Sequence, residues 1–175
     1  MKKNLNNQQQ FLRLFFLLVV IALMMPAVAQ AQSGKPNFAG TWAMNAEKSQ
    51  MGQGGQGFGG GRMNSGNMVV SQDANTLTVE RTRPGRDGGN PVTTTLKYTL
   101  DGKESVNASQ MGDSKSVATW SPDGKSLKIV TTRSFNGNAM TSTEEWSMNG
   151  ANLSIKNTAT TPNGDMTTVM VYDKK

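Results

Sequence analysis

A repeated ten-residue pattern constrains the fold of this chain more than any other feature of its sequence. Segments 70–79, 120–129 and 146–155 align without a gap, and residues 98–102 match the first half of the pattern. Asp-Ala, Asp-Gly or Asn-Gly lies at the centre of each full repeat between alternating apolar residues, which is typical of a β-hairpin with a two-residue turn. The repeats therefore predict an antiparallel sheet built from consecutive hairpins.

The geometry of these turns also predicts which residues lie opposite each other. In a two-residue turn centred on Asp-Gly, the third residue before the Asp pairs with the third residue after the Gly. The expected pairs are Trp120 with Leu127, Trp146 with Leu153, and Val70 with Leu77. Because side chains alternate across a strand, these pairs define one apolar face, which we expect to form the interior.

The same patterns predict ten strands and no segment with a sustained helical period. The expected strands are 38–44, 67–72, 76–83, 92–100, 103–107, 116–121, 126–134, 139–148, 152–160 and 166–173. Tight turns alternate with longer connections, so the turns gather at one end of an up-and-down meander and the longer connections at the other. Such a meander leaves two exposed edges unless it closes on itself, so we predict a closed or nearly closed barrel.

The first 31 residues have the pattern of a secretory signal peptide. Lys2, Lys3 and Arg13 precede or enter a short apolar run, and small residues allow cleavage after Ala29 or Ala31. The alternative is a membrane anchor, but the apolar run is shorter than the ~20 residues that span a bilayer. We therefore expect an exported protein, periplasmic or extracellular, that does not span the membrane after cleavage. Residues 32–175 then form a single domain with a glycine-rich loop at 51–62.

Composition excludes several classes of function. The chain has no histidine and no cysteine, which rules out Cys–His pairs, Ser-His-Asp triads and zinc sites made of these residues. We therefore predict no catalytic residue, no metal site and no cofactor. Removing the signal peptide leaves 15 basic and 12 acidic residues, a formal net charge of +3, because three of the 18 basic residues lie in it. Nucleic-acid binding needs a clustered basic face, and no such run of Lys and Arg is present.

The start of the expected domain resembles a known family. Phe38-Ala-Gly40-Thr-Trp42, followed by Asn45 and Glu47-Lys48-Ser49, is similar to the F-x-G-x-W opening of calycins, the lipocalins and the fatty-acid-binding proteins. The resemblance implies that Phe38, Gly40 and Trp42 plug the closed end of a lipocalin-like barrel. Trp120 and Trp146, beside two tight turns, are expected to join this structural core.

Two features differ from the family's pattern. Fatty-acid-binding proteins carry a helical pair between their first two strands, whereas residues 52–61 here are too rich in glycine to form a helix. The family's carboxylate-binding Arg-x-Tyr on the last strand corresponds to Met170-Val-Tyr172, where a methionine replaces the arginine. The family's route to a fatty-acid carboxylate is therefore not expected in this chain.

Counting outward from each turn gives the residues of the inward face. The apolar ones are Met68, Val70, Leu77, Val79, Leu96, Tyr98, Ala118, Trp120, Leu127, Ile129, Trp146, Leu153, Ile155, Met170 and Tyr172. Polar residues follow nearer the longer connections. We predict a small-molecule site from Arg81, Tyr98, Thr131, Arg133, Glu144, Asn157, Met170 and Tyr172. The alternative is that the polar residues lie in water beyond the rim, or that Glu144 pairs with an arginine.

These observations predict a non-enzymatic binding protein that holds a small apolar or amphipathic molecule inside a β-barrel. The alternative is an envelope interaction or structural module without a small-molecule ligand, which would use the loops or the outer face against a protein partner that the sequence does not identify. A binding site inside the barrel distinguishes the first class from the second.

Overall fold

The computed structural model describes residues 34–50, 67–83, 89–109, 112–135, 137–161 and 164–175. All of them belong to one compact unit, Ser33–Lys175. The expected signal peptide and the glycine-rich loop at 51–62 lie outside the described residues, so both stay predictions. Within the described ranges the protein has no helix that is long and apolar enough to cross a membrane.

The described chain consists of ten β-strands, as the sequence predicts. They are β1 (Gly40–Gln50), β2 (Asn67–Gln72), β3 (Thr76–Arg83), β4 (Val92–Thr99), β5 (Glu104–Asn107), β6 (Ser114–Trp120), β7 (Ser126–Phe135), β8 (Asn138–Asn149), β9 (Asn152–Thr161) and β10 (Gly164–Lys174). Except for β1, each strand begins and ends within about two residues of the prediction, which is the usual uncertainty at element boundaries. β1 begins after Phe38 and continues to Gln50, because an irregularity after Asn45 lets it keep pairing with β10.

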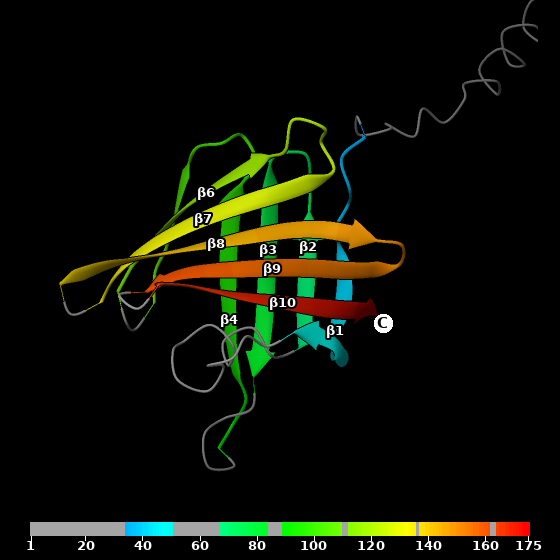
Figure 1. The fold of residues 1–175 in the computed structure, drawn as a ribbon, viewed down its shortest axis with the longest axis horizontal. Helices are drawn as coiled ribbons and strands as arrows, with labels where there is room; N and C mark the ends of the chain where they lie inside the picture. Colours follow the sequence, from blue (N-terminus) through cyan, green and yellow to red (C-terminus); the bar gives the residue numbers. More distant parts are fainter. Residues whose placement is uncertain (1–33, 51–66, 84–88, 110–111, 136, 162–163) are drawn as a thin grey trace, which may run out of the picture. The chain divides into compact units, whose positions relative to one another are not determined.

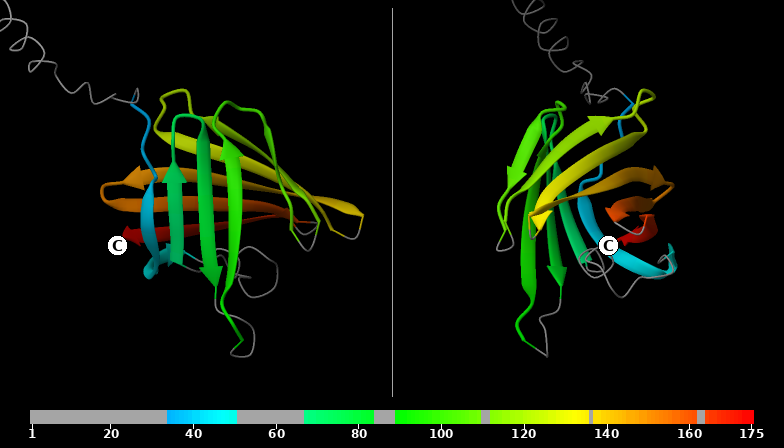
Figure 2. Two further views of the ribbon diagram at one scale, coloured as in Figure 1. Left: turned by 180° about the vertical axis from the view of Figure 1, so that it is seen from behind. Right: turned by 60° about the vertical axis from the view of Figure 1, so that its left-hand side comes forward.

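The strands form one antiparallel sheet in the order β4-β3-β2-β1-β10-β9-β8-β7-β6-β5. Strands β2 to β4 run behind and across β7 to β10, so two parts of the same sheet face each other (Figure 1). The views from behind and from the side show the same arrangement (Figure 2). The first and last strands pair with each other, and β4 and β5 are the two ends of the sheet. The barrel is therefore nearly closed.

The interior between these two parts is the predicted apolar face. The buried apolar residues are Phe38, Trp42, Met68, Val70, Leu77, Val79, Tyr98, Ala118, Leu127, Ile129, Trp146, Leu153, Ile155, Met170 and Tyr172. Leu96 and Trp120 pack against them and are partly buried. The alternation of side chains along each strand therefore predicted these buried apolar residues correctly.

Aromatic side chains fill one end of the interior, as expected from the F-x-G-x-W resemblance. The ring of Phe38 stacks on Trp120 at 5.9 Å between centroids and meets the edge of Trp146 at 5.7 Å. Trp42 is fully buried, and its indole N–H donates a hydrogen bond to the carbonyl of Phe38 at 2.9 Å. We call this end of the barrel, where the tight turns lie, the turn end, and the opposite end the loop end.

The backbone conformation at Gly40 favours glycine. Its φ is +148°, a region that L-residues rarely adopt. A Cβ at this position would lie 2.9 Å from Cε of Lys174, whose ammonium lies 5.6 Å from the centre of the Trp42 ring. The absent side chain therefore lets Lys174 cover the outer side of the tryptophan plug.

Two of the three predicted turn pairs are wrong in register. Trp120 pairs with Leu127 as predicted, whereas Trp146 pairs with Ile155 and Val70 with Val79. In both incorrect cases the two-residue loop lies one residue later than expected. In the turn between β8 and β9, Gly150 takes the first loop position with φ +61°. In the turn between β2 and β3, Asp73 precedes the loop, and its carboxylate accepts the N–H groups of Asn75 and Thr76. Each partner moves by two residues, so every side chain stays on its predicted face.

The turn around Asp123 differs from the prediction in another way. The N–H of Ser121 bonds to the carbonyl of Ser126, so residues 122–125 form a four-residue loop instead of a two-residue one. The N–H of Gly124 donates to the carbonyl of Ser121 at 2.8 Å, which places Pro122 and Asp123 at the centre of the turn. Proline favours this position because its φ is already suitable.

The predicted hairpin between β4 and β5 is also wrong, because only a turn joins them. The described residues show no backbone ladder between the two strands, which form the two ends of the sheet. Asn107 instead accepts the N–H of Lys97 at 2.8 Å and donates to its carbonyl at 3.0 Å. The Ser105 hydroxyl accepts the N–H of Thr99 at 2.9 Å. Ser105 and Asn107 are buried while Val106 is 58% exposed, because the buried side of β5 faces backbone groups that need polar partners.

Replacing Asn107 by Leu is expected to lower the free energy of unfolding by about 1–3 kcal/mol, because the Lys97 N–H and carbonyl lose their partner in a buried position. Urea unfolding measures the loss, and hydrogen exchange at the Lys97 amide should accelerate. The exposed Asn67 provides the matched control, since Asn67→Leu changes the same atoms at the surface. Equal losses in the two variants would show that Asn107 does not join the two strands.

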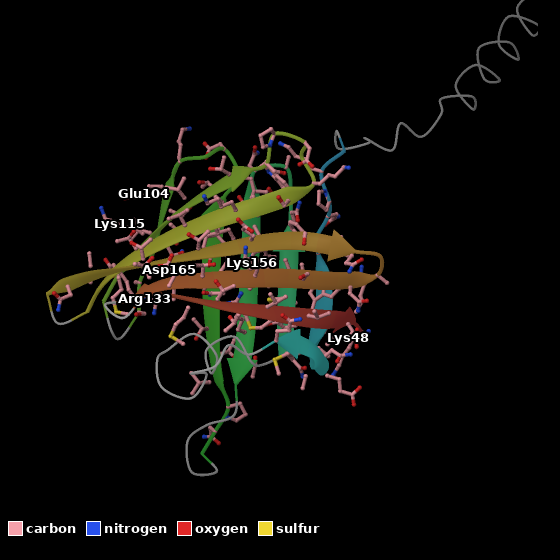
Figure 3. The ribbon with its side chains drawn as sticks, viewed as in Figure 1. Lys48, Glu104, Lys115, Arg133, Lys156 and Asp165 are labelled. Carbon is pink, nitrogen blue, oxygen red and sulfur yellow. The ribbon has the colours of Figure 1, made fainter. Side chains whose placement is uncertain are left out.

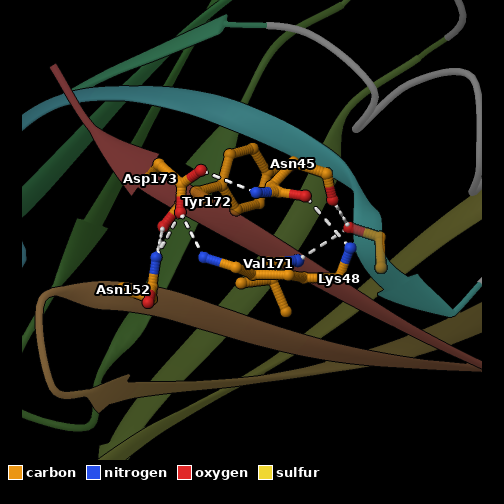
Figure 4. Close-up of polar contacts among 7 residues, drawn as sticks. Asn45, Lys48, Asn152, Val171, Tyr172 and Asp173 are labelled. Carbon is orange, nitrogen blue, oxygen red and sulfur yellow. Dashed lines mark hydrogen bonds and ion pairs between the residues drawn. The ribbon is translucent and has the colours of Figure 1, made fainter.

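A polar cluster fixes the irregular end of β1 against β10. The Asp173 carboxylate accepts hydrogen bonds from Asn45 at 2.7 Å, from Lys48 at 3.1 Å and from the amide of Asn152 (Figure 4). The bond from Asn45 and then that from Lys48 lower the pKa of Asp173. The cluster explains why Asn45 and Lys48 follow the F-x-G-x-W motif: they hold β1, β10 and the β8–β9 turn together.

Candidate functional site

Burial of the inward side chains decreases toward the loop end. Along β7, Leu127 and Ile129 are buried, and Thr131 and Arg133 are partly exposed. Along β10, Tyr172 and Met170 are buried, and Thr168 and Met166 are partly exposed. The turn end is therefore a dry, packed core. The partly exposed inward positions toward the loop end carry the polar Thr131, Arg133 and Thr168 and the apolar Met166.

An ion pair between Arg81 and Glu144 lies at the boundary between these two halves. Arg81 is on β3 and Glu144 on β8, two strands from opposite parts of the sheet, and the Nη1–Oε1 and Nη2–Oε2 distances are both 3.4 Å. The side chains are only 10% and 13% exposed. The sequence alternative in which Glu144 pairs with an arginine is confirmed, and the alternative in which both lie in water beyond the rim is wrong.

Trp146 contacts both members of the pair. Its indole N–H donates to Oε2 of Glu144 at 2.9 Å, and the Arg81 guanidinium lies 5.9 Å from the centre of its ring. Burial has the largest single effect and lowers the pKa of Arg81, but the Glu144 carboxylate and the two tyrosines together outweigh burial, so the pKa is raised. Arg81 is therefore a permanent cation, and its charge is balanced inside the barrel.

Both tyrosines of the chain border this pair. Burial raises the pKa of Tyr172 to about 12, and it also raises the pKa of Tyr98. The Arg81 charge lowers and the Glu144 charge raises both pKa values, each by less than burial does. The Tyr172 hydroxyl lies 3.7 Å from the sulfur of Met170. The two phenols are therefore neutral hydrogen-bonding groups over the physiological pH range.

Tyrosine absorbance at 295 nm is expected to show no transition near pH 10, the ordinary pKa of a tyrosine. Tyr98 and Tyr172 are the two tyrosines of the chain, and both pKa values are raised in the folded protein. The unfolded chain loses these protons near pH 10 while the fold retains them. Their contribution to stability is thus fully present below pH 10 and is lost as the pH rises toward 12. A reversible transition near pH 10 without loss of the near-UV circular dichroism would contradict this assignment.

The other predicted site residues are distributed along the loop half of the interior. Asn157 is buried and pairs across the strands with Glu144. Thr131 is partly buried, and its hydroxyl lies 2.9 Å from that of Ser116. Arg133 lies near the end of β7, toward the end of the barrel where Asp165 lies near the start of β10 (Figure 3). The structure thus brings Arg81, Tyr98, Glu144, Met170 and Tyr172 into one cluster. Asn157 lies opposite Glu144 in this cluster, and Thr131 and Arg133 lie further toward the loop end.

Sequence reasoning missed Ser116, although the signal was present. Ser116 is 1% exposed and lies opposite Thr131 on the neighbouring strand. The correctly predicted pairing of Trp120 with Leu127 fixes this register, so counting four residues outward from each member would have found it. Ser116 is the first residue of the predicted strand 116–121, and the predicted inward face of this strand did not extend beyond Ala118.

Among the residues that the structure describes, no three His, Cys, Asp or Glu side chains are grouped to hold a metal ion. The polar chemistry of the interior in this part of the chain consists of the ion pair, hydroxyl groups and amides. Such groups bind and orient a molecule by hydrogen bonds.

Comparison with known proteins identifies the fold. The chain matches no protein-family model and no curated protein sequence. Among solved structures, zebrafish ileal bile acid-binding protein complexed with cholic acid is 18% identical, with 79% of this chain and 98% of that chain covered at a TM-score of 0.52. Fatty-acid-binding protein 1 of Echinococcus granulosus is 17% identical, with 78% and 96% covered at a TM-score of 0.52.

A third solved structure, the REP1-NXSQ fatty acid transporter, is 14% identical, with 78% of this chain and 95% of that chain covered at a TM-score of 0.55. In all three cases the match extends over nearly the whole of the other chain. The residues Ser33–Lys175 therefore have the nearly closed, ten-stranded barrel fold shared by the fatty-acid-binding proteins and other calycins.

Proposed function

We propose that this protein is a non-enzymatic binding protein that holds a small apolar or amphipathic molecule in the loop half of its barrel. The observation that carries the proposal is the Arg81–Glu144 pair inside the barrel, at the edge of the dry core. Proteins with the same fold include ones named for the fatty acids and bile acids that they bind. That likeness supports the class of function, and the residues of this chain must define its ligand.

The energetics of the pair favour a binding role over a purely structural one. Removing two charges from water costs several kcal/mol per ion, and a well-packed apolar pair of similar volume is often as stable or more stable. A core that served only stability would have little use for Arg81 and Glu144 at this position. A binding site, in contrast, uses a few placed polar groups among apolar walls to orient a ligand.

Apolar and polar walls adjoin in the loop half. Met166 contributes partly exposed apolar surface, and Thr131 and Asn157 contribute hydrogen-bonding groups. An amphipathic molecule satisfies both kinds of wall at once. The proposal also includes export, which the signal-peptide pattern of residues 1–31 supports and which would place the protein in the periplasm or outside the cell.

The experiment that tests the binding role is native mass spectrometry of the mature protein purified gently from its own source, compared with a denatured sample. A reproducible small-molecule adduct that is lost on denaturation would support a carrier. The mass of the intact protein would at the same time locate the cleavage site after Ala29, after Ala31 or elsewhere. Delipidated protein should then bind the neutral fluorescent probe N-phenyl-1-naphthylamine with saturation.

A co-purifying protein mass, together with no saturable probe binding, would contradict the carrier. It would favour an envelope interaction module that binds its partner through the loops or the outer face. The outer face carries surface ion pairs whose members lie on neighbouring strands, such as Glu145–Lys156 and Glu104–Lys115, and the second of these is labelled in Figure 3. Such exposed pairs contribute little to stability and do not by themselves indicate a partner.

A further inference from the structure

We infer that the ligand presents a neutral hydrogen-bonding group, such as a hydroxyl or a carboxamide, to the Arg81–Glu144 pair, and that the pair disfavours a carboxylate at this point. The inference rests on the proposed function and names the ligand class of the same site. Its basis is that the arginine inside this barrel is already neutralised by a carboxylate of the chain itself.

The geometry leaves little unbalanced charge for an anion to recognise. Both terminal nitrogens of Arg81 face the two carboxylate oxygens of Glu144 at 3.4 Å. The pair is nearly buried, so solvent screens it weakly. A ligand carboxylate that reached the guanidinium would lie beside the Glu144 carboxylate, and like charges placed together at a desolvated site are strongly unfavourable.

A neutral group meets complementary partners at the same place. The guanidinium is a hydrogen-bond donor, and the carboxylate is an acceptor that already receives both terminal nitrogens of Arg81 and the Trp146 N–H. A hydroxyl or a primary amide both donates and accepts, so it can bond to both members of the pair without separating them. The neutral phenols of Tyr98 and Tyr172, which adjoin the pair, extend the same kind of surface.

Arg133 does not reverse this preference. Its half-buried side chain also lies on the inward face, but at the loop end of β7, beyond Thr131. A negative group on a ligand would be attracted to Arg133 near the rim. The group that reaches the inner pair would still meet a balanced Arg81.

The test compares three ligands of equal chain length: laurate, dodecanol and lauramide. Each is titrated against delipidated protein loaded with N-phenyl-1-naphthylamine, which is itself uncharged. We expect dodecanol and lauramide to displace the probe at concentrations about tenfold lower than laurate, since a like-charge contact at a buried site costs at least that factor. A lower or equal concentration for laurate would overturn the inference.

The variant Glu144→Gln removes the negative charge of the pair while nearly keeping the shape of the side chain. Glutamine keeps an oxygen that can accept the Trp146 N–H, but it leaves the Arg81 charge unbalanced, so laurate should become the strongest competitor. The matched control is Glu145→Gln, because the neighbouring carboxylate points to the outer face, is 50% exposed and lies 3.9 Å from Lys156. This control should retain the wild-type order.

The possible results distinguish the ligand preference of the Arg81–Glu144 pair from the carrier function itself. An unchanged order in Glu144→Gln, with the fold intact, would overturn the role of the pair while leaving the carrier in place. No displacement by any of the three ligands, together with no probe binding, would overturn the proposed function and the inference with it. If Glu144→Gln does not fold, the wild-type order still decides the ligand class.

Discussion

Replacing Arg81 by Met or Glu144 by Leu is expected to lower the free energy of unfolding by about 3–5 kcal/mol, because each change leaves the other charge buried without its partner. The Glu144 variant also removes the acceptor of the Trp146 N–H. The double replacement should recover most of the loss, since two apolar side chains of similar volume avoid the cost of removing charges from water. Urea unfolding of the four proteins forms a double-mutant cycle.

The control for this cycle is Glu145→Leu, one residue along the same strand. Glu145 is half exposed and its contact with Lys156 is long, so its replacement should change stability by no more than about 0.5 kcal/mol. If the losses of the two single variants simply added in the double variant, the pair would not be coupled. The interaction between Arg81 and Glu144 would then make no measurable contribution to the free energy of unfolding.

The second large effect is expected at Phe38, which packs between Trp120 and Trp146 at the turn end of the barrel. Phe38→Ala should lower the free energy of unfolding by about 3–5 kcal/mol, because it leaves a void between two tryptophans in a fully buried position. Phe38→Leu should cost less, since it retains most of the apolar volume. Tryptophan fluorescence should shift to longer wavelength in the alanine variant as Trp120 and Trp146 lose their common neighbour.

Val106 provides the control for the Phe38 variants, because it is an apolar residue that is 58% exposed. Val106→Ala should leave both the stability and the tryptophan emission nearly unchanged. A wild-type emission spectrum in Phe38→Ala would mean that Phe38 does not fill the space between the rings. A residue that precedes β1 would then have no part in closing the barrel.

The inward face could be predicted because it depends only on the two-residue period of a strand. Two turn registers were wrong, yet Trp146 and Val70 kept their faces, because moving a turn by one residue moves each partner by two. The pairing of Arg81 with Glu144 could not be predicted in the same way. It depends on which strands face each other across the barrel, and sheet twist and strand tilt set this and leave no local mark in the sequence.

The junction of β4 and β5 shows a second limit of local reasoning. Asp101-Gly102 is a good turn, and Gly102 has the positive φ that such a turn needs. The turn nevertheless joins the two ends of the sheet without a backbone ladder, because the pairing of β1 with β10 leaves the opening at this position instead. In the structure Val106 is exposed between buried Ser105 and Asn107, so the apolar residue of β5 lies on its outer side, which the alternation of apolar residues in the sequence does not reveal.

The pairing of the first strand with the last has a consequence for the order in which the protein folds. β1 shares only three paired positions with β2, and its remaining partners lie on β10, with Asn45 and Asp173 separated by 128 positions in the chain. Long-range pairing of this kind slows folding, because a long segment must be ordered before the contact forms. We expect β1 to dock late, so that until β10 arrives its open edge is the part of a newly made chain most exposed to pairing with another molecule.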